Sequence, residues 1–281
     1  MSSPPTNADQ IAFWNGDAGA KWVVQQVRLD AMLAPIGDAV QKAANVQSGE
    51  HILDVGCGCG DTSIKLAKLA GASGGVLGAD VSATMLALAK RRAADAKANI
   101  TFAEADAATH KFDAQAFDLL FSRFGVMFFA DPDAAFANMH KALRATGRVA
   151  FACWRDWREN EWVRVPMMAV RPHVPPQPQL GPEDPGPFAF ADPARVRRIL
   201  ANGGFDAITL TPFDTKMEIG ASLDEAVAYL QEFGPISRAL SDASPAQKEQ
   251  AAKALREALA PYAKTAPITL GAAVWIVTAK A

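Results

Sequence analysis

The sequence predicts an α/β fold built on a doubly wound, mostly parallel sheet. Short apolar runs alternate with helical stretches between about residues 50 and 152, and the first run ends in a glycine loop. An aspartate also stands at or next to the end of each of the first three runs. Alternation at this pace indicates βαβ units, which place parallel strands in one sheet with helices on both faces.

Five strands are predicted in the first half of the chain because apolar, β-favouring residues cluster there. In chain order they cover His51–Val55, Gly75–Asp80, Ile100–Ala105, Phe117–Ser122 and Arg148–Cys153. Residues 61–70 have helical apolar spacing, and Ser82 is placed to cap the next helix. Asp131-Pro132 opens a further helix as N-cap and first residue, and we expect Thr146-Gly147 to close it.

The second half is less regular. Arg171–Pro193 is rich in proline, so it cannot be a central strand or helix, and it is either a linker or an ordered lid. Asp192-Pro193 begins a capped helix that ends at Asn202-Gly203, and capping-box patterns at Ser222 and Ser244 predict two more. The apolar run 272–279 predicts the last strand.

Charge and composition argue against several classes of function. The 28 basic and 30 acidic residues nearly cancel, and no basic stripe suited to nucleic acid is present. Lys90-Arg91-Arg92 is interpreted as a solvated helix face. No run approaches the ~18 apolar residues of a membrane helix, and residues 1–10 do not resemble a secretory signal, so we expect a soluble, cytoplasmic protein.

The three cysteines do not predict a disulfide framework or a metal site. Cys57 and Cys59 flank one glycine, and no nearby cysteine or histidine completes a zinc set. We interpret them as small residues that fill gaps in a glycine loop; binding of an arsenic-type substrate by thiols is the open alternative.

The segment 53–61, which contains the glycine loop, carries the strongest functional signal. Its glycines let a ligand approach the backbone, and the helix after it offers free N–H groups. Asp54, directly before the loop, would repel a pyrophosphate but suits an ammonium group. Asp80 stands where a carboxylate accepts bonds from ribose hydroxyls, and Asp106 could pair with an adenine amine. A dinucleotide loop would have its third glycine where Asp61 stands.

These motifs resemble those of the class I S-adenosylmethionine (SAM)-dependent methyltransferases over roughly Trp22–Trp154. The matching segments are Leu53–Gly60, Gly78–Ser82 with Met85, Ala105–Ala107 on the adenine side, and Phe117–Arg123 for the fourth strand. The overall pattern is similar to that of the small-molecule methyltransferases related to quinone-biosynthesis C-methyltransferases.

The resemblance implies a Rossmann-like sheet of seven strands with helical cap insertions, and SAM as cofactor. It implies four regions: an N-terminal helical cap segment (1–45), a SAM-binding core (46–154), a proline-rich lid or linker (155–192), and completion of the sheet with a helical cap (193–281). The glycines would line the methionine and ribose, and Met85 would pack near adenine. The expected cofactor-binding residues are Asp54, Gly56, Cys57, Gly58, Gly60, Asp80, Val81, Met85, Asp106, Ala107, Ser122 and Trp22.

We therefore expect SAM-dependent methyl transfer to a small, apolar or aromatic acceptor, achieved mainly by proximity and orientation. The Asn/Asp-Pro-Pro-aromatic motif of nucleobase methylation is absent after the fourth strand. Trp14, Phe124 and Trp154 are the expected substrate-pocket residues, although such aromatics also pack helices onto sheets. His173 is a candidate base, and Arg123 is either an anchor for an acidic acceptor or half of a structural ion pair.

Two other functions remain open at this stage. The first is an NAD(P)-dependent oxidoreductase on a related fold, against which stand Asp61 and the lack of a lysine four residues after Tyr229 or Tyr262. The second is a SAM-binding module without catalysis. The acceptor, the methylated atom and the oligomeric state do not follow from the sequence.

Overall fold

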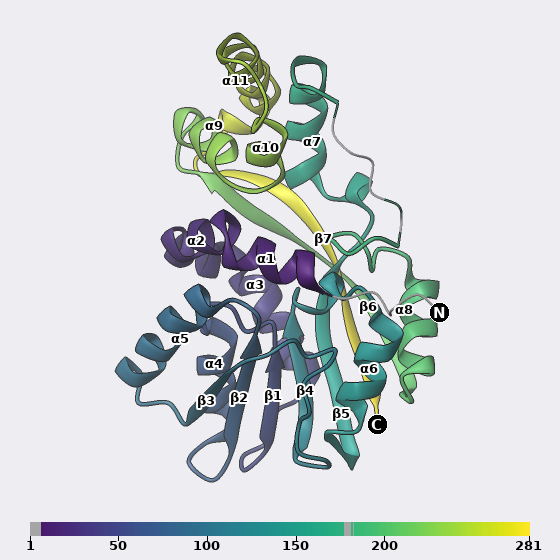
Figure 1. Cartoon of the computed structure of the whole chain (residues 1–281). Coiled ribbons are helices and arrows are strands. Elements are labelled where there is room, and N and C mark those ends of the chain that lie inside the picture. The colour runs from purple at the N-terminus through teal and green to yellow at the C-terminus, as the bar shows by residue number, and fades with distance from the viewer. Residues whose placement is uncertain (1–6, 177–180, 182) are drawn as a thin grey trace. The chain divides into compact units, whose positions relative to one another are not determined.

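A computed structural model describes residues 7–176, 181 and 183–281 (Figure 1). The helices are α1 (Ala8–Asn15), α2 (Asp17–Val24), α3 (Gln26–Ala44), α4 (Asp61–Ala70), α5 (Ala83–Asp95), α6 (Pro132–His140), α7 (Glu161–Val170), α8 (Pro193–Asn202), α9 (Leu223–Glu232), α10 (Gly234–Ala239) and α11 (Pro245–Leu259). The strands are β1 (His51–Val55), β2 (Gly75–Asp80), β3 (Ile100–Glu104), β4 (Phe117–Arg123), β5 (Leu143–Trp154), β6 (Asp206–Gly220) and β7 (Ile268–Lys280).

The strands form one seven-stranded sheet in the order β3-β2-β1-β4-β5-β7-β6. Strands β1 to β5 are parallel, and β7 runs antiparallel to β5. The expected doubly wound, mostly parallel sheet is therefore confirmed. Because β1 lies between β2 and β4, the strand order reverses beside β1, and ligands of such sheets bind at the carboxyl edge at this point.

The chain divides into two compact units. The first comprises 1–154, 183–213 and 274–281, and its core holds fully buried side chains of β4, α6 and β5, among them Phe121, Phe136 and Phe151. The second comprises 155–182 and 214–273, in which α11 packs against α7 and α9. The predicted lid or linker, 155–192, is thus split between the units, and it contains helix α7.

The N-terminal helices α1 and α2 lie across the carboxyl end of β2 (Figure 1). The hydroxyl of Ser82 donates to the carbonyl of Trp14 at 2.8 Å. The amide of Asn15 donates to the carbonyl of Val81 at 2.8 Å, and its oxygen accepts from the N–H of Ala83 at 3.0 Å. Hydrogen bonds therefore dock the first helices on the edge where the sequence places the cofactor.

The predicted helix starts are confirmed, but one helix end is wrong. Ser82, Asp131, Asp192, Ser222 and Ser244 each cap the helix that follows them. However, α6 ends at His140 rather than at Thr146-Gly147. The carbonyls of residues 141 and 142 accept from the N–H groups of residues 115–117, so this backbone has already joined the sheet and β5 begins at Leu143.

Strand β6 has no counterpart in the sequence analysis. It is the last strand in the sheet order, most of its residues are exposed or half-buried, and Pro212 lies inside it. An edge strand tolerates proline and needs no continuous apolar run. In the part of the chain that the structure describes, no helix combines the length and the apolar character needed to cross a membrane.

Candidate cofactor site

The loop between β1 and α4 depends on glycine at three positions. Gly56, Gly58 and Gly60 have φ of +67°, +55° and +83°, a left-handed conformation that other residues rarely adopt. A Cβ at Gly56 would lie 2.6 Å from the Cα of Gly125, so two backbones cross there. Among the described residues, a Cβ at Gly58 would meet only the sulfur of Met85, at 3.9 Å. The loop is therefore closed by backbone at Gly56 and has space around Gly58.

Asp80 ties the end of β2 to this loop. Its Oδ2 accepts from the N–H of Gly58 and its Oδ1 from the N–H of Ser82, both at 2.8 Å. Burial raises the pKa of Asp80, and these backbone bonds oppose the rise. A carboxylate offers about four acceptor positions, so the two bonds leave capacity for ligand hydroxyls.

Asp54 lies beneath the loop with no exposed surface. Its Oδ2 accepts from the hydroxyls of Thr62 at 2.7 Å and Ser63 at 2.6 Å, while Oδ1 accepts no hydrogen bond from the described part of the chain. Burial raises its pKa to about 6, against the effect of both hydroxyls. A buried carboxylate oxygen without a donor fits a ligand that presents an ammonium group, directly or through water.

Asp106 follows β3 and connects the adenine-side motif to the N-terminus. Its Oδ1 accepts from the amide of Asn7 and from the N–H of Ala108, both at 3.0 Å. The oxygen of Asn7 accepts from the N–H of Ala130 at 2.8 Å, and the carbonyl of Ala107 accepts from the amide of Asn138 at 3.1 Å. Asn7 and Asn15 could not be predicted from the sequence, since nothing in a polar terminus distinguishes these asparagines from others.

The thiols of the glycine loop are buried rather than reactive. Burial raises the pKa of Cys57 well above its ordinary value and that of Cys59 to about 12. The thiolate is the reactive form, so both cysteines remain protonated thiols at neutral pH. The interpretation of these cysteines as small residues that fill space in the loop fits this burial.

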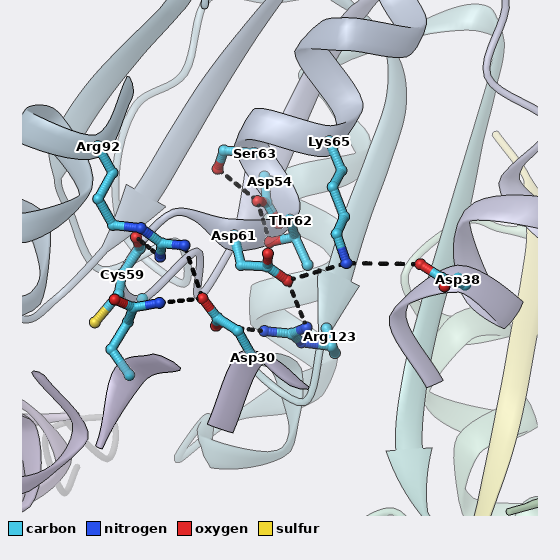
Figure 2. A network of polar contacts seen from close by, with 12 residues as sticks. Asp30, Asp38, Asp54, Cys59, Asp61, Thr62, Ser63, Lys65, Arg92 and Arg123 are labelled. Atoms are coloured by element: carbon cyan, nitrogen blue, oxygen red, sulfur yellow. Dashed lines mark hydrogen bonds and ion pairs between the residues drawn. The ribbon is translucent and has the colours of Figure 1, made fainter. Parts of the chain in front are cut away.

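Arg123, at the end of β4, forms ion pairs in the network shown in Figure 2. Its Nη1 donates to Asp61 at 2.9 Å, and its Nη2 lies 3.9 Å from Asp30. Asp61 also lies 3.4 Å from the ammonium of Lys65. Arg123 thus has the structural ion pair that the sequence left as one alternative, and an additional contact with the acceptor stays a prediction.

Ser122 joins the ends of β1 and β4. Its hydroxyl is fully buried, donates to the carbonyl of Val55 at 2.7 Å and accepts from the N–H of Gly125 at 3.1 Å. It therefore holds the crossing of Gly125 over Gly56 in place.

Two groups of aromatic rings accompany the site. Phe124 stacks on Trp154 with ring centroids 4.2 Å apart and planes 9° from parallel. Phe124 also has φ +68°, which costs a non-glycine residue ~1–2 kcal/mol. Trp14 packs edge-on against Trp22 and Phe128. Strained residues often mark functional sites, so Phe124 is a strong candidate for contact with a ligand.

His173 ends the short 3-10 helix Arg171–His173 in the second unit and is partly buried. Its role as a base stays a prediction.

The fold and this loop define a class of protein. A glycine loop after β1, carboxylates at the ends of β2 and β3, and the strand order 3-2-1-4-5-7-6 together describe a class I SAM-dependent methyltransferase domain. Residues 52–147 match the family described as a methyltransferase domain. SAM is the methyl donor that this family uses.

Among curated relatives, the ubiquinone/menaquinone biosynthesis C-methyltransferase UbiE of Cellvibrio japonicus is 36% identical over 110 residues, which cover 38% of this chain and 44% of the relative. The aklanonic acid methyltransferase DauC of a Streptomyces species is 33% identical over 118 residues, 42% of this chain and 54% of the relative. The chain thus spans about half the length of these relatives.

Likeness to solved structures extends beyond the methyltransferase domain. The [4+2]-cyclase SpnF matches with a TM-score of 0.54 and 15% identity, over 98% of this chain and 97% of the other. At this identity the likeness shows the fold alone, and the fold does not specify the reaction.

Proposed function

We propose that this protein transfers the methyl group of SAM to a small, apolar or aromatic acceptor. The observation that carries the proposal is the open space around Gly58 in a loop whose conformation Asp80 holds from the end of β2. This combination offers a ligand close approach to the backbone, together with a carboxylate at the end of the second strand, where ribose hydroxyls bind in such folds.

The proposed cofactor position follows the edge of the sheet. The loop glycines and Cys57 would line the methionine and ribose, Asp80 with Val81 would hold the ribose, and Asp106 with Ala107 would contact the adenine. Met85, buried beside Gly58, would pack against the base. When bound, SAM supplies an electrophilic methyl group. The orphan Oδ1 of Asp54 supports an ammonium group at the methionine end.

The proposed acceptor contacts are the stacked Phe124 and Trp154, with Trp14 from the N-terminal helices. Phe124 directly precedes Gly125, whose backbone crosses Gly56, so the ring pair begins next to the glycine loop. Flat apolar rings suit a flat apolar acceptor. The names of the relatives support the same class of acceptor, because one is a C-methyltransferase of ubiquinone/menaquinone biosynthesis and the other an aklanonic acid methyltransferase.

The chain's contribution to catalysis is to orient the acceptor. SAM carries its own leaving group, and orientation alone can supply on the order of 7–11 kcal/mol. Arg123 is engaged by Asp61 and Asp30, so it does not carry the proposal.

Thermal unfolding with SAM, its demethylated product or NADH tests the cofactor. At ~100 times its dissociation constant a ligand adds ~2.7 kcal/mol, or about 5–10 °C. We expect a shift with SAM and its product, and none with NADH. Asp80→Ala should abolish it, while Asp113→Ala, an exposed aspartate of the same domain, should keep it.

A second arm tests methyl transfer. Purified protein is incubated with methyl-labelled SAM and a panel of quinols, phenols and aliphatic acids, and label in the acceptor is measured. Label in the aromatic members supports the proposal. SAM binding without label in any acceptor would favour a non-catalytic module, and a shift with NADH alone would favour an oxidoreductase.

A further inference from the structure

One guanidinium connects the glycine loop to two helices (Figure 2). Arg92 of α5 donates from Nη1 to the carbonyl of Cys59 and from Nη2 to Oδ2 of Asp30 on α3, both at 2.7 Å. The Arg92 side chain is 23% exposed and that of Asp30 is 16% exposed. The interpretation of Lys90-Arg91-Arg92 as a solvated face is therefore wrong for Arg92, because its side chain reaches inward from the end of the run.

The peptide unit between Cys59 and Gly60 is hydrogen-bonded at both its carbonyl and its N–H. The carbonyl of Cys59 is held by Arg92, and the N–H of the following Gly60 donates to the carbonyl of Cys57 at 2.9 Å. Asp80 holds the N–H of Gly58 one residue earlier. Arg92 of α5 thus holds the carbonyl of Cys59, and Asp80 at the end of β2 holds the N–H of Gly58. The space at Gly58 therefore lies in a part of the loop that is held at both of these backbone groups.

Asp30 in turn fixes the position of the guanidinium. The amide of Gln26, one turn earlier on α3, donates to the same Asp30 oxygen, and Arg123 approaches the other oxygen. The network in Figure 2 balances three cations, Lys65, Arg92 and Arg123, against Asp30, Asp38 and Asp61. Asp30 precedes residues 52–147, so it is contributed from outside the segment that matches the methyltransferase domain.

We propose that Arg92, oriented by Asp30, is a positioning residue that holds the glycine loop in its ligand-binding conformation and so raises the affinity for SAM. The inference rests on the proposed function for its ligand. A loop ordered before binding loses less conformational entropy when the ligand arrives. The role requires arginine, because its planar fork reaches two acceptors at once, whereas a lysine ammonium is a point charge.

The experiment compares Arg92→Met, Arg92→Lys and Asp30→Asn with the wild type by calorimetric titration with SAM. Arg91→Met is the matched control, since Arg91 is the exposed neighbour on the same helix. We expect Arg92→Met to raise the Kd about tenfold, equivalent to ~1.4 kcal/mol, with unchanged stoichiometry. Arg92→Lys should fall between Arg92→Met and the wild type, and Arg91→Met should stay within about twofold. The double variant Arg92→Met/Asp30→Asn should bind SAM with nearly the same Kd as Arg92→Met alone, because Asp30 acts through Arg92.

Hydrogen exchange without ligand tests the loop separately from SAM binding. Amides of residues 58–61 should exchange faster in Arg92→Met and Asp30→Asn, with β4 and β5 unchanged, and should not change in Arg91→Met. Unaltered exchange at the loop, or reduced stoichiometry with an unchanged Kd, would overturn the positioning role. Altered exchange in a protein that does not bind SAM would retain the loop contact but refute both the proposed function and the claim about SAM affinity.

Discussion

One methyl group added to the glycine loop should have different consequences at Gly56 and at Gly58. In Gly56→Ala the new Cβ lies 2.6 Å from the backbone of Gly125. The left-handed φ costs ~1–2 kcal/mol and the overpacking another ~1–3 kcal/mol, so the total loss is ~2–5 kcal/mol. In Gly58→Ala the sulfur of Met85, at 3.9 Å, is the one contact of the Cβ with the part of the chain that the structure describes, so the conformational cost of ~1–2 kcal/mol remains.

The assay combines urea unfolding with calorimetric titration of SAM. Gly58→Ala should stay folded yet bind SAM at least about tenfold more weakly, because the methyl group fills space that the ligand needs, and tenfold corresponds to ~1.4 kcal/mol. In Gly56→Ala the free energy of unfolding should fall further than in Gly58→Ala. Gly234→Ala is the control, since Gly234 also has a left-handed φ, of +79°, and a Cβ there meets none of the described residues within 4 Å.

Two results would refute this reasoning. If Gly58→Ala bound SAM as tightly as Gly234→Ala, the open side of the loop would not be the ligand side. If Gly56→Ala were no less stable than Gly58→Ala, the close approach of Gly125 would not constrain the loop.

Three further predictions concern the rest of the site. Because burial raises the pKa of Asp54 from 3.8 to about 6, the folded state binds the proton more tightly than the unfolded state. Relative to Asp54→Asn, the wild-type free energy of unfolding should therefore fall by ~2 kcal/mol as pH rises from about 4 to about 6. Urea unfolding at stepped pH measures this, and a pH-independent difference would contradict it. Trp154→Ala should raise the acceptor KM at least about fivefold through loss of the stack on Phe124, equivalent to ~1 kcal/mol, with SAM affinity within about twofold; equal losses in both would argue against an acceptor role. Asn15→Ala removes the bonds to Val81 and Ala83, so limited proteolysis should cut α1 and α2 faster than in the wild type, and unchanged cleavage would show that these bonds do not dock the helices.

Much of the fold and part of the site could be predicted from local pattern. The strands β1 to β5, the caps at Ser82 and Asp131, and the glycine loop follow from residues within a few positions of one another. The loop glycines and Asp80 are adjacent in the structure because parallel strands end at one edge of a sheet, which is a general rule rather than a feature of this chain.

Contacts between distant residues could not be predicted in this way. Nothing near Arg92 distinguishes it from Arg91, yet one side chain bonds to a carbonyl 33 residues away and the other is exposed. Asn7 reaches Asp106 across 99 residues. Arg123 left two alternatives open in the sequence, and only its distance to Asp61 gives it a structural ion pair.

The sequence by itself determined the strands β1 to β5, the glycine loop between β1 and α4 and the class of ligand, because backbone conformation and apolar periodicity are local properties. The tertiary structure decided which polar groups meet: Arg92 with Asp30 and Cys59, Gly125 over Gly56, and β6 at the edge of the sheet. Those pairings depend on how separate segments pack, and a side chain's partner is set by that packing rather than by its neighbours in the chain.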